Sequence, residues 1–492
     1  MDAQKRSWPA LLSLDAKRAV PLHRQLYAEL RQAIVNGRFA PGVALPASRV
    51  LARDLRISRN TVLAAFEQLL AEGYLVSRHG SGTFVTESLP DDMLWLRNPP
   101  SGEKREQISL GLSNRGERLG RGSNFFPPVK PQPFRHGLPA LDSFPKRLWA
   151  RIASREWRGI STKTLSYGDA AGYRPLREAV ATYLAQARAV RCTADQIMMV
   201  AGSQQALYLV AHLLLDPGDA VWFEDPGYLG ARAAFQAAGA RIVPAPVDGE
   251  GLSVVAAKKR GGRACVAYVT PSNQYPTTVT MSLGRRLELL DWARRARMWI
   301  IEDDYDSEFR YTSRPIASLQ GLDPSGRVIY IGTFSKLLAP CLRLGYIVLP
   351  AALVDSFTAA SAVITRHLPS LEQVALAAFI GEGHLARHVR QMRQLYEQRR
   401  SHLVSAVREE LSEWLEIQPP DAGTHALAWL KSGLDDKSVA EAARPEGVEL
   451  RAFSTYCLRP AKRSGLILGY GAFGRAEIRS GVQRLARILR SF

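Results

Sequence analysis

The stretch VIYIGTFSKLLAP, residues 328–340, carries the clearest structural signal in this chain. Four apolar residues are followed by glycine, small polar residues and Lys336. Such a run is typical of a strand buried on both faces of a parallel sheet, with a polar turn at its carboxyl end. A lone lysine is usually a surface residue. Lys336 has apolar residues on both sides, however, and a desolvated lysine has a lowered pKa and condenses readily with an aldehyde.

Five further apolar runs of this kind lie along the chain, at residues 197–200, 220–223, 264–269, 299–301 and 345–349. Helical patterns alternate with these runs from about residue 172 onward. This alternation predicts an α/β fold, in which a mostly parallel sheet is covered by helices on both faces. Ligands of such sheets bind at the carboxyl ends of the strands, so the polar residues there are candidates for a site.

Two groups of these polar residues suit a phosphate. Gly202, Ser203 and Gln204 follow the run at 197–200 and open a helix, where free N–H groups attract anions. Arg343, seven residues after Lys336, is a second candidate for a phosphate anchor. Turns of the first kind often only cap a helix, so neither group is specific by itself.

Two other polar residues at strand ends, Tyr228 and Asp303, suit a ligand with a flat ring. Tyr228 follows the run at 220–223 and can stack on a planar ligand. Asp303 follows the run at 299–301, and a carboxylate there can keep a ring nitrogen protonated, as the partner of pyridoxal 5′-phosphate does. Strand-end carboxylates are more often caps or surface charges. A single pyridoxal-phosphate ligand nevertheless explains Lys336 and all the signals around it.

Residues 20–86 have a different pattern. Apolar residues recur at helical spacing in residues 22–34, 50–55 and 62–70, and the last two patterns are joined by a very short turn. Two short β patterns then flank residues 79–82, which predicts a hairpin. We therefore expect an α+β winged helix-turn-helix, whose last helix puts its N-terminal residues against DNA bases.

The predicted DNA contacts begin at Ser58, the expected N-cap of the third helix. Arg59 suits guanine and Asn60 suits adenine in the major groove, while Thr61 suits a phosphate. Arg78 lies near the tip of the wing, together with His79. The same pattern is compatible with an ordinary three-helix module that has a solvated basic face.

The charge of the chain favours a polyanionic partner. The formal net charge is +19, and residues 1–86 hold 12 Lys and Arg against 6 Asp and Glu. Residues 131–492 hold 46 against 34 over about four times the length, so the excess is denser at the N-terminus. In the larger segment it is compatible with a basic soluble surface or, less simply, with a second DNA contact.

Residues 87–130 contain several Pro and Gly pairs and charges of both signs, which predicts a flexible linker between two domains, 20–86 and 131–492. Residues 1–19 are expected to be an N-terminal tail. The four cysteines have no paired spacing, so we expect neither a metal site nor a disulfide framework. Without an apolar segment typical of a signal peptide or membrane helix, we expect a cytoplasmic protein.

The N-terminal module closely resembles the GntR-type winged helix. The resemblance rests on LPASR at 45–49, ISRNTV at 57–62, EGY at 72–74 and GSGTFV at 80–85. In that family the positions of Arg49, Arg59, Asn60, Thr61 and the wing glycine Gly80 contact DNA.

From about Phe134 onward the chain resembles the fold-type I aminotransferases. The resemblance rests on YGDAAG at 167–172, EDPGY at 224–228, TPSNQYPT at 270–277, EDDYDSEFRY at 302–311 and SK at 335–336. The same strings behind a GntR-type winged helix resemble the MocR/GabR regulators, over nearly the entire chain.

This resemblance implies that Lys336 binds pyridoxal 5′-phosphate as a Schiff base, that Asp303 pairs with the pyridine nitrogen and that Tyr305 hydrogen-bonds the phenolic oxygen. It places Tyr228 near the ring and Asn273 in contact with the cofactor. The residues implied to hold the phosphate are Gly202, Ser203, Gln204, Ser335 and Arg343. Tyr167 would reach the phosphate of the neighbouring subunit, which implies a head-to-tail homodimer.

Two departures from the aminotransferase pattern bear on the ligand. Asn273 and Thr278 stand where the family usually has histidine and glycine, and Thr278 brings a side chain to a turn that normally has none. Ile467 stands where aminotransferases have the arginine that binds the substrate α-carboxylate. Two interpretations of Arg232 and Arg451 remain open: either one binds the substrate carboxylate in place of that arginine, or both are structural residues.

Three functions remain compatible with these residues. The first is a dimeric regulator that binds an operator in double-stranded DNA and senses an amine, an amino acid or pyridoxal phosphate itself. The second is a working aminotransferase with an attached DNA-binding module, and the third is a DNA-binding protein whose C-terminal fold has lost its cofactor. The winged helix and Ile467 argue against the second, and the intact set of Lys336, Asp303, Tyr305 and Arg343 argues against the third.

Overall fold

A computed structural model describes residues 12–15, 18–78, 80–89, 111–120, 131–261, 263–311, 317–431 and 433–492. The chain divides into two compact units, Met1–Leu110 and Gly111–Phe492. The boundary lies inside the predicted linker. No helix among the described residues combines the length and the apolar character that crossing a membrane requires.

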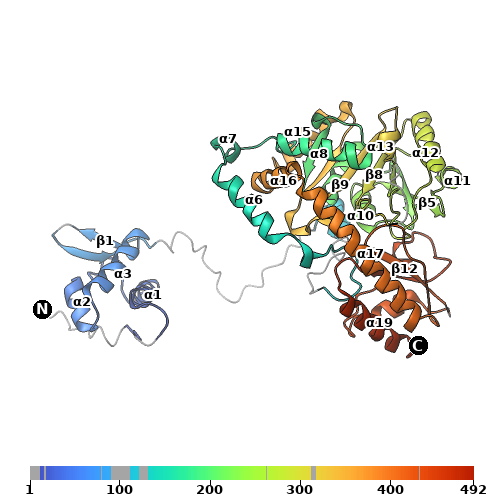
Figure 1. Cartoon of the computed structure of the whole chain (residues 1–492). Coiled ribbons are helices and arrows are strands. Elements are labelled where there is room, and N and C mark those ends of the chain that lie inside the picture. Colours follow the sequence, from blue (N-terminus) through green and yellow to red (C-terminus); the bar gives the residue numbers. More distant parts are fainter. Residues whose placement is uncertain are drawn as a thin grey trace. The chain divides into compact units, whose positions relative to one another are not determined.

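The first unit is the predicted winged helix-turn-helix (Figure 1). Its elements are α1 (Leu22–Val35), α2 (Ser48–Asp54), α3 (Arg59–Ala71), β1 (Leu75–Arg78) and β2 (Gly82–Val85). Apolar faces of the three helices pack around Leu26, Leu51 and Val62, which are fully buried. The strands β1 and β2 pair antiparallel, so the hairpin is held to the helices through Leu75 and Val85.

The second unit is built on an eight-stranded sheet in the order β3-β10-β9-β8-β7-β4-β5-β6. Its strands are β3 (Ile197–Val200), β4 (Ala220–Asp225), β5 (Arg241–Asp248), β6 (Gly251–Leu252), β7 (Val266–Val269), β8 (Trp299–Asp304), β9 (Val328–Thr333) and β10 (Gly345–Val348). Neighbours from β9 through β5 are parallel, whereas β10 pairs antiparallel with both β3 and β9. The predicted mostly parallel sheet is therefore confirmed, with all six expected strands.

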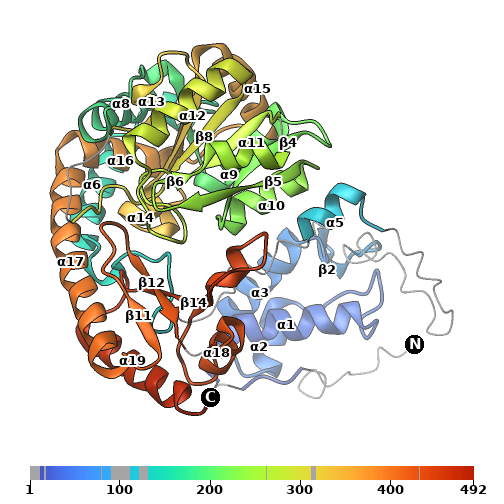
Figure 2. The same cartoon turned by 90° about the vertical axis from the view of Figure 1, so that its right-hand side faces the viewer.

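Helices cover both faces of this sheet (Figures 1 and 2). On one face, α9 (Ser203–Leu214), α10 (Leu229–Ala237) and α15 (Val354–Ile364) pack on residues such as Val221 and Phe223. On the other, α11 (Val254–Gly261), α12 (Leu283–Ala296) and α13 (Leu319–Leu322) pack on Trp222 and its neighbours. Because successive side chains of a strand point to opposite faces, burial of both faces requires the continuous apolar runs seen in the sequence.

The opposite end of that second face is covered by α8 (Arg174–Arg188) and α16 (Ser370–Gly381). The same unit contains α6 (Lys146–Arg158), α7 (Thr162–Leu165) and the four-residue α14 (Phe334–Leu337), which follows β9 directly.

The 27-residue helix α17 (His384–Glu410) leads from the large sheet to a smaller subdomain (Figure 1). This contains an antiparallel sheet in the order β11-β12-β14-β13, with β11 (Leu415–Ile417), β12 (His425–Leu430), β13 (Arg451–Ala452) and β14 (Gly465–Gly469). Helices α18 (Asp436–Ala443) and α19 (Arg475–Leu489) pack beside it. One apolar core continues through α17 into both subdomains.

A short helix, α5 (Asn114–Gly120), lies within the segment that the sequence predicts to be a flexible linker. It belongs to the second unit and packs against α10 (Figure 2). Most of its residues are exposed, so this packing is shallow.

Candidate cofactor and DNA-binding sites

A cavity of about 750 Å³ lies at the carboxyl ends of the parallel strands, where the sheet topology predicts a ligand. Nine of the predicted site residues line it: Gly202, Ser203, Gln204, Tyr228, Asp303, Tyr305, Ser335, Lys336 and Arg343. These residues span 141 positions of the sequence, from 202 to 343, and the strands bring them to one edge of the sheet.

One end of the cavity suits a phosphate. Gly202 has a φ of +95° and precedes α9, so the free N–H groups of that helix face this end. The guanidinium of Arg343 donates to the carbonyl of Ala201 at 2.6 Å. A Cβ added to Gly202 would lie 3.4 Å from the same guanidinium. That distance is an ordinary van der Waals contact, so the positive φ rather than lack of space favours glycine here. The cation and the helix start together make a cradle for an anion.

Asp303 lies deeper and fits a protonated ring nitrogen. Tyr268 donates to its Oδ2 at 2.7 Å. Its Oδ1 is buried and accepts no hydrogen bond from the part of the chain that the structure describes. Burial raises the pKa of Asp303 to about 6, against the opposing effects of Tyr268 and Lys336. An ionised carboxylate with one unpartnered oxygen is costly unless a cation pairs with it, and a pyridinium nitrogen would do so.

Lys336 stands beside this carboxylate at the start of α14. Its Nζ donates to the carbonyl of Gly137 at 2.5 Å. Burial lowers the pKa of Lys336, while Asp306 and Asp303 act in the opposite direction. The amine is thus held where a lowered pKa favours the nucleophilic form, as the apolar flanks in the sequence predict.

The loop after β7 places its residues differently from the prediction. Tyr305 donates to the backbone carbonyl of Asn273 at 2.8 Å. The Asn273 side chain donates to Asp306 at 2.9 Å, and the residues of this loop among the described cavity lining are Thr270 and Tyr275 rather than Asn273. Thr278 has a φ of +64°, so a β-branched residue occupies a conformation that favours glycine.

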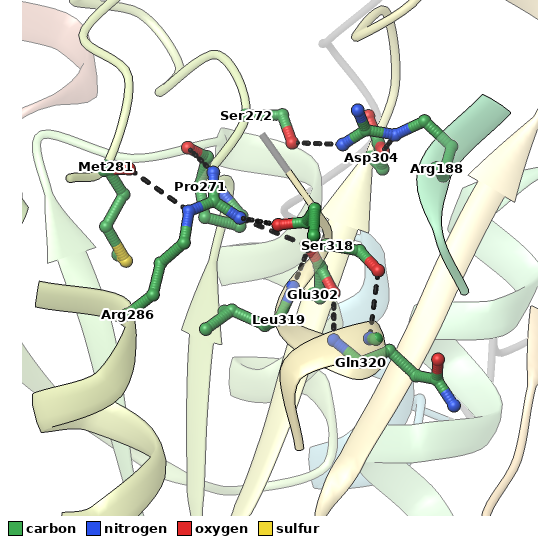
Figure 3. Close-up of polar contacts among 12 residues, drawn as sticks. Arg188, Pro271, Ser272, Met281, Arg286, Glu302, Asp304, Ser318, Leu319 and Gln320 are labelled. Atoms are coloured by element: carbon green, nitrogen blue, oxygen red, sulfur yellow. Dashed lines mark hydrogen bonds and ion pairs between the residues drawn. The ribbon is translucent and has the colours of Figure 1, made fainter. Parts of the chain in front are cut away.

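This loop is fixed by a buried polar network (Figure 3). The Arg286 guanidinium donates to the carbonyls of Met281 and Pro271 at 3.1 and 2.8 Å. Glu302, from β8, accepts from the backbone N–H groups of Leu319 and Gln320, each at 2.9 Å. The network joins both ends of the loop to the sheet that carries Asp303.

A buried ion pair continues the network toward α8. Arg188 donates to Asp304 Oδ2 at 2.8 Å and to Ser272 Oγ at 2.6 Å. Tyr330 also donates to Asp304, at 2.6 Å. The side chains of Arg188 and Asp304 are 4% and 1% exposed, so neither charge has water to replace its partner.

Among the cavity residues that were not assigned from the sequence are His136, Tyr275 and His425. Tyr275 lies inside a string that resembles the aminotransferases, so that string was the available signal. His136 and His425 lie in segments with no motif, and only the fold brings them to the cavity. Arg118 and Leu119 of α5 also line it.

The remaining predicted residues lie outside the cavity lining. Tyr167 is 72% exposed and Arg366 lies over its ring at 3.9 Å, so the phenol is on the surface of its own chain. Burial lowers the pKa of Arg232, which is on α10. Arg451 is opposite Ile467 in the register of β13 and β14, and Ile467 is fully buried.

In the first unit, the predicted recognition residues begin α3. Ser58 Oγ accepts from the backbone N–H of Thr61 at 3.1 Å, which confirms Ser58 as the N-cap. Arg59 and Asn60 are exposed, and Arg59 Nε lies 3.4 Å from Ser48 Oγ. Their position at the exposed start of the helix is the one from which such helices read bases.

The other predicted DNA contacts flank this helix. Arg49 is exposed on α2. Arg78 is exposed in the wing beside Glu87, at 3.3 Å, and Gly80 has a φ of +75° at the wing turn. His79 lies outside the described residues.

Family comparisons match both units of the chain. Residues 22–85 match the model for bacterial regulatory proteins of the gntR family, and residues 142–463 match aminotransferase class I and II. The chain is 40% identical to the probable rhizopine catabolism regulatory protein MocR of Rhizobium meliloti, over 96% of this chain and 95% of that protein. It is 32% identical to the HTH-type transcriptional regulator TauR of Rhodobacter capsulatus, over 95% and 96%.

Solved structures similar to the second unit are aminotransferases. Kynurenine aminotransferase of Pyrococcus horikoshii, in a complex that contains PMP, has a TM-score of 0.68 and 29% identity, covering 79% of this chain and 97% of that one. The α-aminoadipate aminotransferase LysN of Thermus thermophilus, complexed with a phosphopyridoxyl-leucine, has a TM-score of 0.68 and 28% identity, covering 77% and 95%. Enzymes of this fold depend on pyridoxal phosphate, and that is the cofactor expected in the cavity. With a DNA-binding unit of the gntR family joined to an aminotransferase-like unit, the chain belongs to the MocR-type helix-turn-helix transcriptional regulators.

Proposed function

We propose that this regulator binds pyridoxal phosphate in the cavity and changes its affinity for an operator when an amine, an amino acid or the cofactor itself arrives there. The observation that carries the proposal is that one cavity is lined both by the amine of Lys336 and by Asp303, whose buried Oδ1 has no hydrogen-bond partner among the described residues. An amine beside a carboxylate that requires a cation is the arrangement this cofactor needs, and it has no evident use in an apolar core.

The residues divide the cofactor between them. Asp303 would hold the ring nitrogen, Tyr305 the phenolic oxygen and Lys336 the aldehyde carbon, with Tyr228 near the ring. The phosphate would be held by Gly202, Ser203, Gln204, Ser335 and Arg343, all of which line the cavity. Bound there, pyridoxal phosphate supplies an aldehyde carbon on which Lys336 and a free amine can exchange.

Sensing is favoured over turnover by the residue at the carboxylate position. An efficient transaminase needs a guanidinium that holds the substrate carboxylate in a fixed orientation. Ile467 provides none, and it is buried among apolar residues. An active aminotransferase remains the alternative, because Lys336 and Asp303 are both present.

The position of α5 supports a route from the cavity to DNA. Arg118 and Leu119 belong to the wall of the cavity and also to the segment that leads to the winged helix. A ligand can shift the DNA-bound state only through differential contacts in the two states. A helix that is shallowly packed over the cavity is able to make such contacts.

We further propose a cytoplasmic head-to-tail homodimer. The exposed Tyr167 would reach the phosphate in the neighbouring subunit, and two winged helices would bind two half-sites of one operator. The start of α3 would contact the DNA through Ser58, Arg59, Asn60 and Thr61. The DNA backbone would be contacted by Arg49, Arg78 and Gly80.

The test is an absorption spectrum of the purified full-length protein, with operator binding measured in parallel. We expect a yellow protein whose band is removed by borohydride, and a Lys336→Ala variant that lacks the band and no longer responds to effector. An equally coloured Lys336→Ala protein with a reducible adduct elsewhere would overturn the site. Keto-acid production in the same samples separates the regulator from the aminotransferase.

A further inference from the structure

One wall of the cavity consists of uncharged polar side chains. His136, Tyr275, Thr424 and His425 line the cavity, and Tyr456, which is not among the described lining residues, is hydrogen-bonded to Tyr275. We call these five residues the tyrosine–histidine wall. The wall adjoins the reactive amine, because Lys336 Nζ donates to the carbonyl of Gly137, the residue after His136. A ligand attached at Lys336 therefore has this wall beside it.

The wall is held together by its own hydrogen bonds. Tyr275 donates to the hydroxyl of Tyr456 at 3.1 Å, and that hydroxyl lies 3.4 Å from His136 Nε2. The rings of Tyr275 and His425 pack with their centroids 5.3 Å apart. These contacts fix hydroxyl and imidazole groups, which both donate and accept, next to the cavity.

The wall carries no positive charge among its described members. Burial lowers the pKa of His425 to about 4 and that of His136 well below its usual value, so both imidazoles are neutral at physiological pH. The cations that do line the described cavity lie elsewhere: Arg343 at the phosphate end, Lys336 at the reaction centre and Arg118 on α5.

Behind the wall the packing is apolar. Ile467 is completely buried and is not among the described residues that line the cavity. It packs with Tyr275, Leu427, Phe453 and Tyr456. Arg451 faces Ile467 across the strand pair, but the described cavity lining does not include it. Arg451 acts electrostatically on His136 and Tyr456, and Arg135 acts on His136, but neither guanidinium is among the described residues that line the cavity. A carboxylate placed against the wall would lose its water without a guanidinium partner among the wall residues, whereas alcohol groups would find hydrogen-bond partners there.

We propose that the effector is a primary amine that carries hydroxyl groups and no carboxylate. Its amine would be placed at Lys336 and its hydroxyls against the tyrosine–histidine wall. This inference rests on the proposed function, since it assumes a cofactor at Lys336, and it narrows the effector from any amine or amino acid to a class of amino alcohols.

The test uses cofactor-loaded full-length protein and two matched ligand pairs, serinol with serine and alaninol with alanine. The members of each pair differ only in replacing a carboxylate by an alcohol. The readouts are the change in the cofactor absorption band and the change in the fraction of operator DNA that the protein binds. We expect each alcohol to half-saturate at a concentration at least about tenfold below that of its amino acid.

Three variants sharpen the comparison. Ile467→Arg restores a cation at the carboxylate position and should reverse the order within each pair. Val255→Arg, which adds the same charge on the exposed side of α11, should keep the order of the wild type. Tyr275→Phe, which removes a hydroxyl from the cavity lining, should weaken serinol several-fold and leave 2-aminopropane, which has no hydroxyl, unchanged.

The inference is wrong if the amino acids bind as well as the alcohols or better. Loss of such amino-acid binding in Arg451→Gln would show that Arg451 is the carboxylate anchor. It is also wrong if the protein holds a borohydride-reducible cofactor and neither alcohol acts on it. A protein with no reducible cofactor at Lys336 would instead overturn the proposed function on which this inference rests.

Discussion

The winged helix and the cofactor cavity use polar side chains in opposite ways. Arg59 and Asn60 are exposed and adjacent in sequence, and they need only the N-cap of one helix to place them. Asp303 and Lys336 are withdrawn from bulk water, and they depend on partners from distant segments, Tyr268 and Gly137. An exposed polar group loses little on folding, whereas a buried one loses its hydration and must be compensated.

The comparison predicts that substitutions around the cavity alter stability and those on the DNA face alter binding. The largest effect is expected for Arg188→Ala, which leaves the buried Asp304 carboxylate without its cation. Removing one partner of a buried pair costs about 3–5 kcal/mol in the free energy of unfolding. Urea denaturation measures this, with Arg294→Ala, from an exposed pair with Asp291, as the control that leaves the midpoint unchanged.

Asp303→Asn should weaken cofactor binding while the fold persists. The substitution keeps the shape but removes the charge from a charge-assisted hydrogen bond, which is worth about 1.5–3 kcal/mol, or roughly tenfold or more in Kd. Titration of the apoprotein with pyridoxal phosphate gives the value. Glu250→Gln, an exposed carboxamide replacement, is the control, and equal affinities for the two variants would contradict the role of Asp303.

On the DNA face, Arg59→Ala should weaken operator binding by about 1–3 kcal/mol if Arg59 reads a guanine, and should relax specificity at that base. Because Arg59 is exposed, we expect the unfolding midpoint to stay unchanged. Binding measured at several salt concentrations separates this loss from a general loss of phosphate contacts. A footprint that is indifferent to Arg59, Asn60 and Thr61 would place the recognition surface elsewhere.

Cofactor affinity should also depend on pH through Asp303. Burial raises its folded pKa to about 6, so below that pH the carboxyl is protonated and cannot pair with a ring cation. Lowering the pH from 7 to 5 should therefore weaken binding by roughly tenfold. The same raised pKa means that the apoprotein loses stability as the pH rises from the unfolded value toward 6. Asp303→Asn should lack this component of both pH profiles.

The smallest effect is expected at the N-cap. Ser58→Ala removes the side chain that accepts from Thr61, and such losses cost about 1 kcal/mol. Hydrogen exchange in residues 59–71 of the full chain measures the local change. Ser58→Asp should keep the cap but weaken DNA binding through its negative charge. Equal exchange in Ser58→Ala and the wild type would mean that the cap does not hold the helix.

Much of the larger fold could be predicted because most of its strands are buried on both faces. Burial of both faces requires an uninterrupted apolar run, as in β3 and β9, and such runs are visible without an alignment. The strand β5 was not predicted, since Pro244 and Pro246 interrupt its pattern. The small sheet was missed as well, because two of its strands, β11 and β13, have only three and two residues and the sheet shares its core with α17 and α19.

The site residues also fall into those that could be predicted from the sequence and those that could not. The sequence by itself determined the residues that follow the buried strands, Lys336 and Asp303 among them, because chain direction in a parallel sheet brings every such position to one edge. It also determined the start of α3, because an N-cap is a local interaction. Only the tertiary structure decided that Tyr275, His136 and His425 share a wall with Lys336, and that Asn273 turns toward Asp306. Those placements depend on packing between the two subdomains, which leaves no periodicity or spacing in the sequence.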